Sequence, residues 1–202
     1  MSGVDDRLAT QIGFLVELDK AKRVWRQSWL TDGSRKENDA EHMWHLALFV
    51  LVLAEHAAEP VDVGRVLKMV LLHDIVEIDA GDTYIYDEEA RASQEEREGR
   101  AADRIYGLLP ADQAVALRAL WDEFEARRTP DARFAAAVDR LQPLLLNLVT
   151  KGRAWREHGM TAERVLAVNE KIGEASPVLW DYARSLLDEA VERGYLEPGP
   201  RG

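Results

Sequence analysis

The sequence predicts an all-α, single-domain helical bundle, and three observations support this fold class. Apolar residues recur at helical spacing from residue 4 to residue 193, and proline or a capping residue precedes most of these segments. No internal repeat, low-complexity segment or long linker divides the chain. With 202 residues, 47% of them hydrophobic and 31% charged, the chain can bury one sizeable core. We therefore expect one domain over residues 1–196 and a disordered tail over residues 197–202.

The N-terminal half is predicted to contain three long helices. The first spans about residues 4–30 and ends where Gly, Ser, Asn and Asp interrupt the apolar pattern in TDGSRKENDAE. The second starts near residues 38–39, an Asn-Asp pair suited to an N-cap, and runs to the break at Pro60. The third spans about residues 62–80, with Gly81 as its C-terminal stop.

The segment MVLLHDIV within the third helix has an alternative interpretation as a buried strand of an α/β sheet. Its apolar pattern continues for about 18 residues, however, whereas strands usually stop at about 8. We therefore expect a helix. The C-terminal half continues with a loop at GDTYIYD and a charged outer helix over EEARASQEEREGRAADRIYGLL. Further helices are predicted to follow Pro110, Pro130, Thr161 and Pro177.

Composition excludes several classes of protein. The formal net charge of −11 argues against a broad nucleic-acid surface or binding to anionic lipid, because both depend on clustered Lys and Arg. No stretch is long and apolar enough to span a membrane, and the N-terminus carries acids where a signal peptide needs a basic start. We therefore expect a cytoplasmic protein. Because the chain contains no cysteine, any metal must be held by nitrogen and oxygen ligands.

Polar side chains interrupt the apolar run VLLHDIVEIDAGD. On a helix, His73, Asp74 and Glu77 fall within one sector and face one cavity. Two more polar residues lie within apolar segments elsewhere in the chain. They are His42, in the first turn of the second helix, and Asp139, within FAAAVDRLQPLLLNLV. Burying an unpaired carboxylate costs several kcal/mol, so these groups need a compensating partner. Two imidazoles and two carboxylates are a recurrent ligand set for one divalent transition metal ion, Mn, Fe, Co, Ni or Zn.

Each of these residues taken alone has a simpler interpretation. A single His near a helix start is often a capping or core residue, and a single Asp in a helix is often salt-bridged, here to Arg140 or Arg133. The other histidines are not expected to be ligands. His56 is predicted to lie at the surface, His45 to make a core or supporting contact, and His158 to interact with carbonyls at a helix end.

At these residues the chain resembles the HD-domain metal-dependent phosphohydrolases, whose pattern is an early His, a central His-Asp pair and a late Asp. Within that family it is most similar to the 5′-deoxynucleotidase branch, through RKENDAEHMWH, LLHDIVEIDAGDT and AVDRLQPLL. The resemblance implies an HD-type bundle and a homodimer. It also implies the metal ligands His42, His73, Asp74 and Asp139.

The same resemblance implies roles for other residues of the motifs. Glu77 and Asp82 match acidic positions that handle water and protons, and Arg26 and Trp29 match substrate contacts. In this chain Trp25 precedes Arg26 and Trp29 follows three residues later, instead of one aromatic directly after the arginine. Core packing at the end of the first helix is the alternative role for both tryptophans.

The predicted reaction is metal-dependent hydrolysis of (deoxy)ribonucleoside 5′-monophosphates to nucleoside and phosphate. A divalent ion polarises a phosphoryl oxygen and lowers the pKa of bound water. One metal with Arg26 and either Arg35 or Lys36 as cations matches a single phosphate better than a triphosphate, and Thr83 is a further expected substrate contact. Two alternatives remain: another HD-type hydrolase, of cyclic or polyphosphorylated nucleotides, and a non-enzymatic metal-stabilised helical binding protein.

Overall fold

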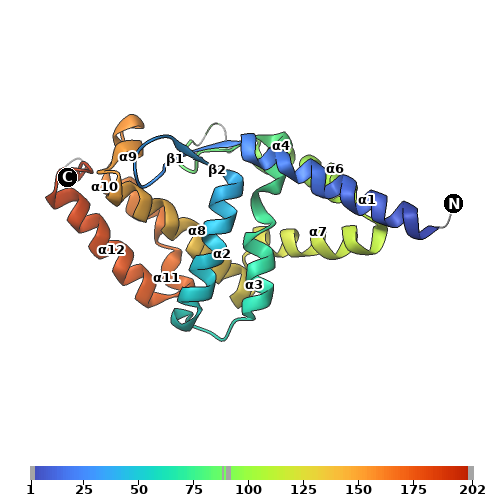
Figure 1. Cartoon of the computed structure of the whole chain (residues 1–202). Coiled ribbons are helices and arrows are strands. Elements are labelled where there is room, and N and C mark those ends of the chain that lie inside the picture. Colours follow the sequence, from blue (N-terminus) through green and yellow to red (C-terminus); the bar gives the residue numbers. More distant parts are fainter. Residues whose placement is uncertain (1–2, 88, 90–91, 200–202) are drawn as a thin grey trace.

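The computed structural model describes residues 3–87, 89 and 92–199 (Figure 1). Within these ranges the chain is helical apart from one short two-stranded sheet, which confirms the predicted fold class. No helix of this part of the chain is long and apolar enough to cross a membrane. The α-helices are α1 (Gly3–Leu18), α2 (Asp39–Leu53), α3 (Val63–Val70), α4 (Glu77–Ala80), α6 (Gln94–Tyr106), α7 (Ala111–Ala126), α8 (Pro130–Val149), α9 (Arg153–Glu157), α10 (Ala162–Asn169), α11 (Ile172–Ala175) and α12 (Pro177–Glu192). The 3-10 helices are η1 (Asp19–Arg23), η2 (Ala54–His56) and η3 (His73–Val76), and the strands are β1 (Trp25–Trp29) and β2 (Lys36–Asn38).

The prediction of a single first helix over residues 4–30 is wrong. Helix α1 ends at Leu18, a 3-10 turn follows, and the chain then extends as β1. Strand β1 pairs antiparallel with β2, with Trp25 opposite Asn38 and Trp29 opposite Lys36. The partner strand satisfies the backbone groups of β1 and so overrides the local helical pattern.

The start of α2 lies where the sequence predicts it. The side chain of Asn38 accepts a hydrogen bond from the backbone N–H of Glu41, and the Glu41 side chain accepts one from the backbone N–H of Asn38. This capping box satisfies two donors that a helix start otherwise leaves without partners. It fixes the first turn of α2, which carries His42.

The segment predicted to form the third helix is mostly helical, but it is not one continuous helix. Helix α3 ends at Val70, and the chain re-enters helical structure only at η3 and α4. Side chains from two other helices satisfy carbonyl groups at this break. The Tyr106 hydroxyl donates to the Leu72 carbonyl at 3.1 Å, and the Trp121 indole donates to the His73 carbonyl at 3.1 Å. Gly81, at φ +75°, ends α4 as predicted.

In the C-terminal half, four helices begin where the sequence predicts. Helices α7, α8, α10 and α12 begin at or directly after the four predicted residues, and Thr129, Thr161 and Ser176 cap three of them through their hydroxyl groups. The predicted charged helix corresponds to α6, which begins at Gln94; residues 88, 90 and 91 of that segment lie outside the described residues. At the predicted tail, the Glu197 carbonyl accepts a hydrogen bond from the Ala162 N–H at 2.7 Å, and residues 200–202 lie outside the described ranges.

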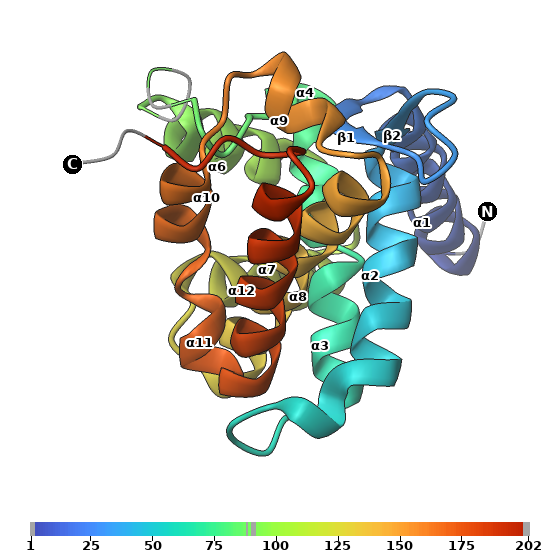
Figure 2. The same cartoon turned by 90° about the vertical axis from the view of Figure 1, so that its left-hand side faces the viewer.

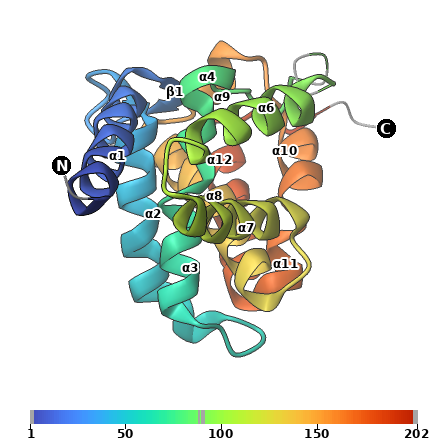
Figure 3. The same cartoon turned by 90° about the vertical axis from the view of Figure 1, so that its right-hand side faces the viewer.

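Two clusters of buried apolar residues organise the helices. In one, α2, α3, α11 and α12 surround the long helix α8 (Figure 2). In the other, α1, α4, α6 and α7 pack together (Figure 3). Segment η3 lies between the two clusters, because the His73 ring contacts Phe124 of the first while the His73 carbonyl binds Trp121 of the second. The His-Asp pair therefore lies at the junction of two cores.

Candidate metal centre and catalytic cleft

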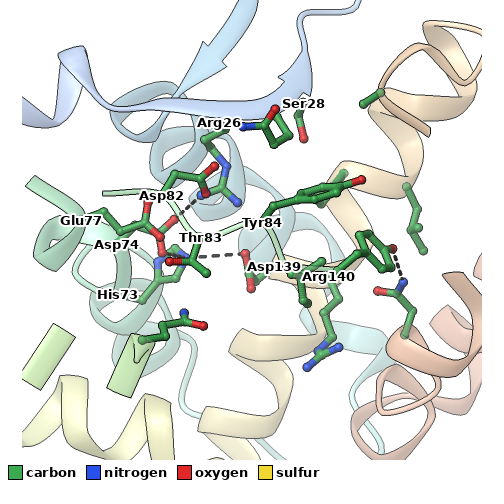
Figure 4. A pocket seen from close by; sticks show the side chains of 18 of the residues that line it. Arg26, Ser28, His73, Asp74, Glu77, Asp82, Thr83, Tyr84, Asp139 and Arg140 are labelled. Atoms are coloured by element: carbon green, nitrogen blue, oxygen red, sulfur yellow. Dashed lines mark hydrogen bonds and ion pairs between the residues drawn. The ribbon is translucent and has the colours of Figure 1, made fainter. Parts of the chain in front are cut away.

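The four predicted metal ligands come from three elements and lie within a few ångströms of one another. Figure 4 shows three of them, His73, Asp74 and Asp139. His42 projects from the first turn of α2, His73 and Asp74 from η3, and Asp139 from the middle of α8. The Asp139 Oδ1 atom lies 3.0 Å from His42 Nε2 and 3.6 Å from His73 Nε2. Asp74 lies 3.1 Å from His73 Nε2 through Oδ1 and 3.7 Å from His42 Nε2 through Oδ2. The sequence places these residues 97 positions apart at the extremes, and the fold brings them together.

The two imidazole rings are oriented as ligands to a common ion would be. The Nδ1 atom of His73 lies 3.0 Å from the Val70 carbonyl, and because a carbonyl only accepts, this nitrogen carries the proton. His73 Nε2 has no hydrogen-bond partner among the described residues, although it is buried. One donor atom each from His42, His73 and Asp139 lie within 4.8 Å of one another. This set of nitrogen and oxygen donors fits a divalent transition metal ion.

The electrostatic field at this point favours a cation. Burial lowers the pKa of His73, but Asp74 and Asp139 outweigh it and raise the pKa to about 10. Burial raises the pKa of Asp74, but His73 and Arg26 outweigh it and lower the pKa to about 2. Burial likewise raises the pKa of Asp139, but its hydrogen bond to His42 and the nearby charge of His73 outweigh burial and hold the pKa well below its usual value. The same negative field that keeps a proton on His73 attracts a metal ion.

A second layer of buried polar residues supports His42, and the sequence analysis missed most of it. The Glu37 carboxylate, 3% exposed, lies 3.6 Å from His42 Nδ1 through Oε2 and accepts a hydrogen bond from Gln142 through Oε1 at 2.8 Å. The Gln142 amide also lies 3.2 Å from His45 Nδ1, so His45 makes the supporting contact that the sequence predicts. The position of Gln142, one helical turn after Asp139, is a signal from which it could have been found.

Arg26 lies beside a group of carboxylates. Its Nη1 atom donates to Asp74 Oδ2 at 2.5 Å and lies 3.7 Å from Asp39, which is fully buried. Asp39, Asp74 and Glu77 form a second set of oxygen atoms within 4.8 Å of one another. Burial, followed by the charges of Asp74 and Asp39, raises the pKa of Glu77. The Arg26 guanidinium group offsets part of this negative charge. Its contacts with Asp74 and Asp39 hold Arg26 at the cleft.

Three of the four predicted metal ligands, His73, Asp74 and Asp139, line a cleft of about 170 Å³, and the fully buried His42 lies behind them. Arg26, Glu77, Asp82 and Thr83 line the same cleft, as the sequence predicts (Figure 4). Burial raises the pKa of Asp82, and its Oδ2 atom has no hydrogen-bond partner in the described part of the chain. The cleft is lined in addition by residues with no predicted role, among them Ser28, Tyr84, Tyr86, Glu98, Arg127 and Arg140.

Two predicted substrate contacts lie elsewhere. The Trp29 indole donates to Glu157 at 3.0 Å and packs under the Arg153 guanidinium, so it contacts α9 and is not among the described residues that line the cleft. Arg35 is exposed and pairs with Glu41 outside the cleft. For Trp29 the cause is the unpredicted strand β1, in which Arg26, Gln27 and Ser28 line the cleft while Trp29 contacts α9.

The structure also corrects the prediction for His158. Its Nε2 atom lies 3.1 Å from the Gln27 side-chain oxygen, and its ring packs on Tyr84 with the centroids 4.2 Å apart. It therefore joins α9 to the loop after α4, whereas the sequence predicted a contact with terminal helix carbonyls.

Comparison with known proteins places this geometry in a family. Residues 18–180 match the family model described as HD domain. The chain is 31% identical over 146 residues to 5′-deoxynucleotidase HDDC2 of Bos taurus, covering 72% of this chain and 69% of that protein. It is 29% identical over 133 residues to the Homo sapiens protein of the same name, covering 65% of this chain and 64% of the relative.

Comparison with solved structures agrees with this family match. A crystal structure described as a predicted metal-dependent phosphohydrolase from Magnetospirillum magnetotacticum is 58% identical, has a TM-score of 0.91, and covers 95% of this chain and 96% of that one. The PH0347 protein from Pyrococcus horikoshii, at 20% identity, a TM-score of 0.62 and coverage of 90% and 99%, shares the fold. The family match and the relatives confirm the resemblance found in the sequence: the chain belongs to the HD-domain family and is similar to its 5′-deoxynucleotidases.

Proposed function

We propose that this HD-domain hydrolase removes the phosphate from nucleoside 5′-monophosphates, with a preference for 2′-deoxyribose, and that it uses one divalent transition metal ion held by His42, His73, Asp74 and Asp139. The observation that carries the proposal is the meeting of these four side chains beside a cleft, which His73, Asp74 and Asp139 line together with Arg26, Glu77 and Asp82. The names of the relatives, 5′-deoxynucleotidases, support the choice of substrate and sugar.

The residues of the cleft divide the work of hydrolysis. When bound, a divalent ion offsets charge on the phosphoryl oxygens and lowers the pKa of water. Glu77, whose Oε2 atom lacks a hydrogen-bond partner among the described residues, accepts a proton from the attacking water. Arg26 holds the phosphate. Asp82, whose Oδ2 atom also has no hydrogen-bond partner among the described residues, donates a proton to the 5′ oxygen as its bond to phosphorus breaks, leaving a nucleoside and inorganic phosphate.

The charge of the cleft supports a monophosphate over the alternative substrates. Its described lining contains six carboxylates (Asp74, Glu77, Asp82, Glu98, Glu125, Asp139) and three arginines (Arg26, Arg127, Arg140). A triphosphate needs more cationic partners than this. A purely structural metal site, the other alternative, has no use for Glu77 and Asp82 at an open cleft.

We further propose that the protein is a cytoplasmic homodimer. Exposed apolar side chains repeat at helical spacing on α1 (Leu8, Ile12, Leu15, Val16) and on α2 (Trp44, Leu48, Leu51, Val52). Contiguous apolar surface of this kind marks interaction sites more often than single exposed residues do. The nucleotide chemistry supports the cytoplasmic location.

Replacing Asp74 or Asp139 by Ala should abolish metal retention and lower the melting temperature, because the remaining donors lose a charge that holds the ion. Elemental analysis after dialysis measures the bound metal. Asp103→Ala serves as the matched control, since that carboxylate is 75% exposed. Full metal occupancy in both ligand variants would remove this assignment.

Replacing Glu77 by Gln should preserve metal content and lower kcat by about 10²–10⁴-fold, the usual contribution of a proton-transfer group. Steady-state kinetics and elemental analysis on the same preparation separate the two effects. Glu96→Gln, on an exposed part of α6, should leave both unchanged. Full activity of the Glu77 variant excludes the role given to it.

The wild-type enzyme should show a higher kcat/KM for deoxyribonucleoside monophosphates than for the matched ribonucleoside monophosphates, and little turnover of triphosphates. The comparison uses one base in all three forms, with and without chelator. Equal values for the two sugars would leave a general nucleotidase, and activity confined to triphosphates would overturn the monophosphatase assignment.

Replacing Leu51 by Glu should shift the protein from dimer to monomer in sedimentation velocity, because it places a charge in the exposed apolar stripe of α2. Val115→Glu, at another exposed apolar residue on α7, is the control and should remain dimeric. A wild-type protein that is monomeric at micromolar concentration contradicts the proposal.

A further inference from the structure

Arg97 of α6 contacts the loop that carries Asp82, and it does so on both sides of that residue. Its Nη1 atom donates to the carbonyl of Ala80, and its Nη2 atom donates to the Thr83 hydroxyl at 3.0 Å. Its Nε atom donates to the hydroxyl of Ser93, just before α6, at 3.3 Å. One guanidinium group therefore joins the loop to the start of α6 and brackets Asp82.

The loop needs such a contact to hold Asp82 in one place. Gly81 adopts φ +75° and ψ 150°, a conformation that stops α4 and that residues other than glycine rarely adopt. The backbone N–H of Gly81 binds the Glu77 carbonyl at 2.8 Å, and residues 81–83 form no helix or strand. The Asp82 Oδ2 atom is buried without a hydrogen-bond partner among the described residues, so no bond at that oxygen fixes its position. The placement of this carboxylate depends on the backbone that Arg97 holds.

The shape of the arginine side chain suits this task. A guanidinium group is planar, and its two terminal nitrogens present donors in a fixed fork. Acceptors on both sides of Asp82 therefore set the direction of the loop as well as its distance from α6. A lysine ammonium is a single point of charge and cannot reproduce this fixed geometry.

Arg97 is not among the described residues that line the cleft, although it touches Thr83, which does. Any effect on the reaction must pass through the loop. We infer that Arg97 is a positioning residue that holds Asp82 at the distance and angle required to protonate the leaving oxygen. The inference rests on the proposed function, because it assumes the role given to Asp82.

The kinetic test compares Arg97→Ala and Arg97→Lys with Arg100→Ala, a matched control three residues along α6 whose side chain is 69% exposed. Arg97→Ala should lower kcat on a deoxynucleoside monophosphate by about 10–10²-fold, the cost of a misplaced catalytic group, with little change in KM. Arg97→Lys should recover part of the loss, and Arg100→Ala should match the wild type. Metal content should be the same in all variants, since none of the four proposed ligands lies on this loop.

A double-mutant cycle with Asp82→Asn distinguishes positioning from a general loss of stability. If Arg97 acts through Asp82, Arg97→Ala should cause little further loss of kcat in the Asp82→Asn background. Equal losses in both backgrounds, or a rise in KM without a fall in kcat, would overturn the inference.

Hydrogen–deuterium exchange tests the structural part of the inference without any substrate. The amides of residues 81–87 should exchange faster in Arg97→Ala than in the wild type, while the amides of α8 remain unchanged. Unchanged exchange in the loop would show that Arg97 does not hold it. Faster exchange in a protein that hydrolyses no monophosphate would instead locate the failure in the proposed function.

Discussion

The structure depends on one buried contact, in which the Asp139 carboxylate of α8 meets the imidazoles of His42 and His73. Each group alone is costly to bury, because its charge or its polar atoms lose their hydration. Together they compensate one another, and the set retains the donor geometry of a metal site. The contact joins α2, η3 and α8, which are distant in sequence. The elements around it are arranged so that these three can approach.

The interruption between α3 and α4 is a consequence of that arrangement. The segment from His73 to Val76 adopts a 3-10 turn, and carbonyls at the break are satisfied by the Tyr106 hydroxyl and the Trp121 indole. These two side chains belong to the second apolar cluster, which α1, α4, α6 and α7 form. That cluster therefore does more than bury surface: it holds the His-Asp pair in a conformation that a regular helix does not provide.

Buried polar residues around the four clustered side chains link them to neighbouring elements of the bundle. Glu37 lies between His42 and Gln142, and Gln142 reaches His45. Arg26 lies against Asp39 and Asp74 and faces the cleft. Such supporting groups orient ligands and adjust their basicity. The small β-hairpin is what allows these contacts to form, since β1 supplies Arg26 and Glu37 is the middle residue of β2.

The sequence by itself determined the helical class, the starts of α2, α7, α8, α10 and α12, and the choice of four polar residues that the fold brings together. These features are local: helical periodicity, capping residues and prolines act within a few positions, and a charged residue inside an apolar run stands out without reference to other elements. The family resemblance predicted roles for Arg26, Glu77 and Asp82, and Thr83 was an expected substrate contact; all four line the cleft.

Only the tertiary structure decided where the strand forms and which residues from distant segments join the site. Strand β1 replaced the end of the first helix because a partner strand satisfied its backbone, and this turned Trp29 toward α9. Glu37 and Gln142 became part of the site because β2 leads directly into α2, which packs against α8. Arg97 came to bracket Asp82 because α6 packs against α4, just before the loop. A contact between segments far apart in the chain produces no periodic pattern in the sequence of either segment. It stabilises the structure only once the helices have packed.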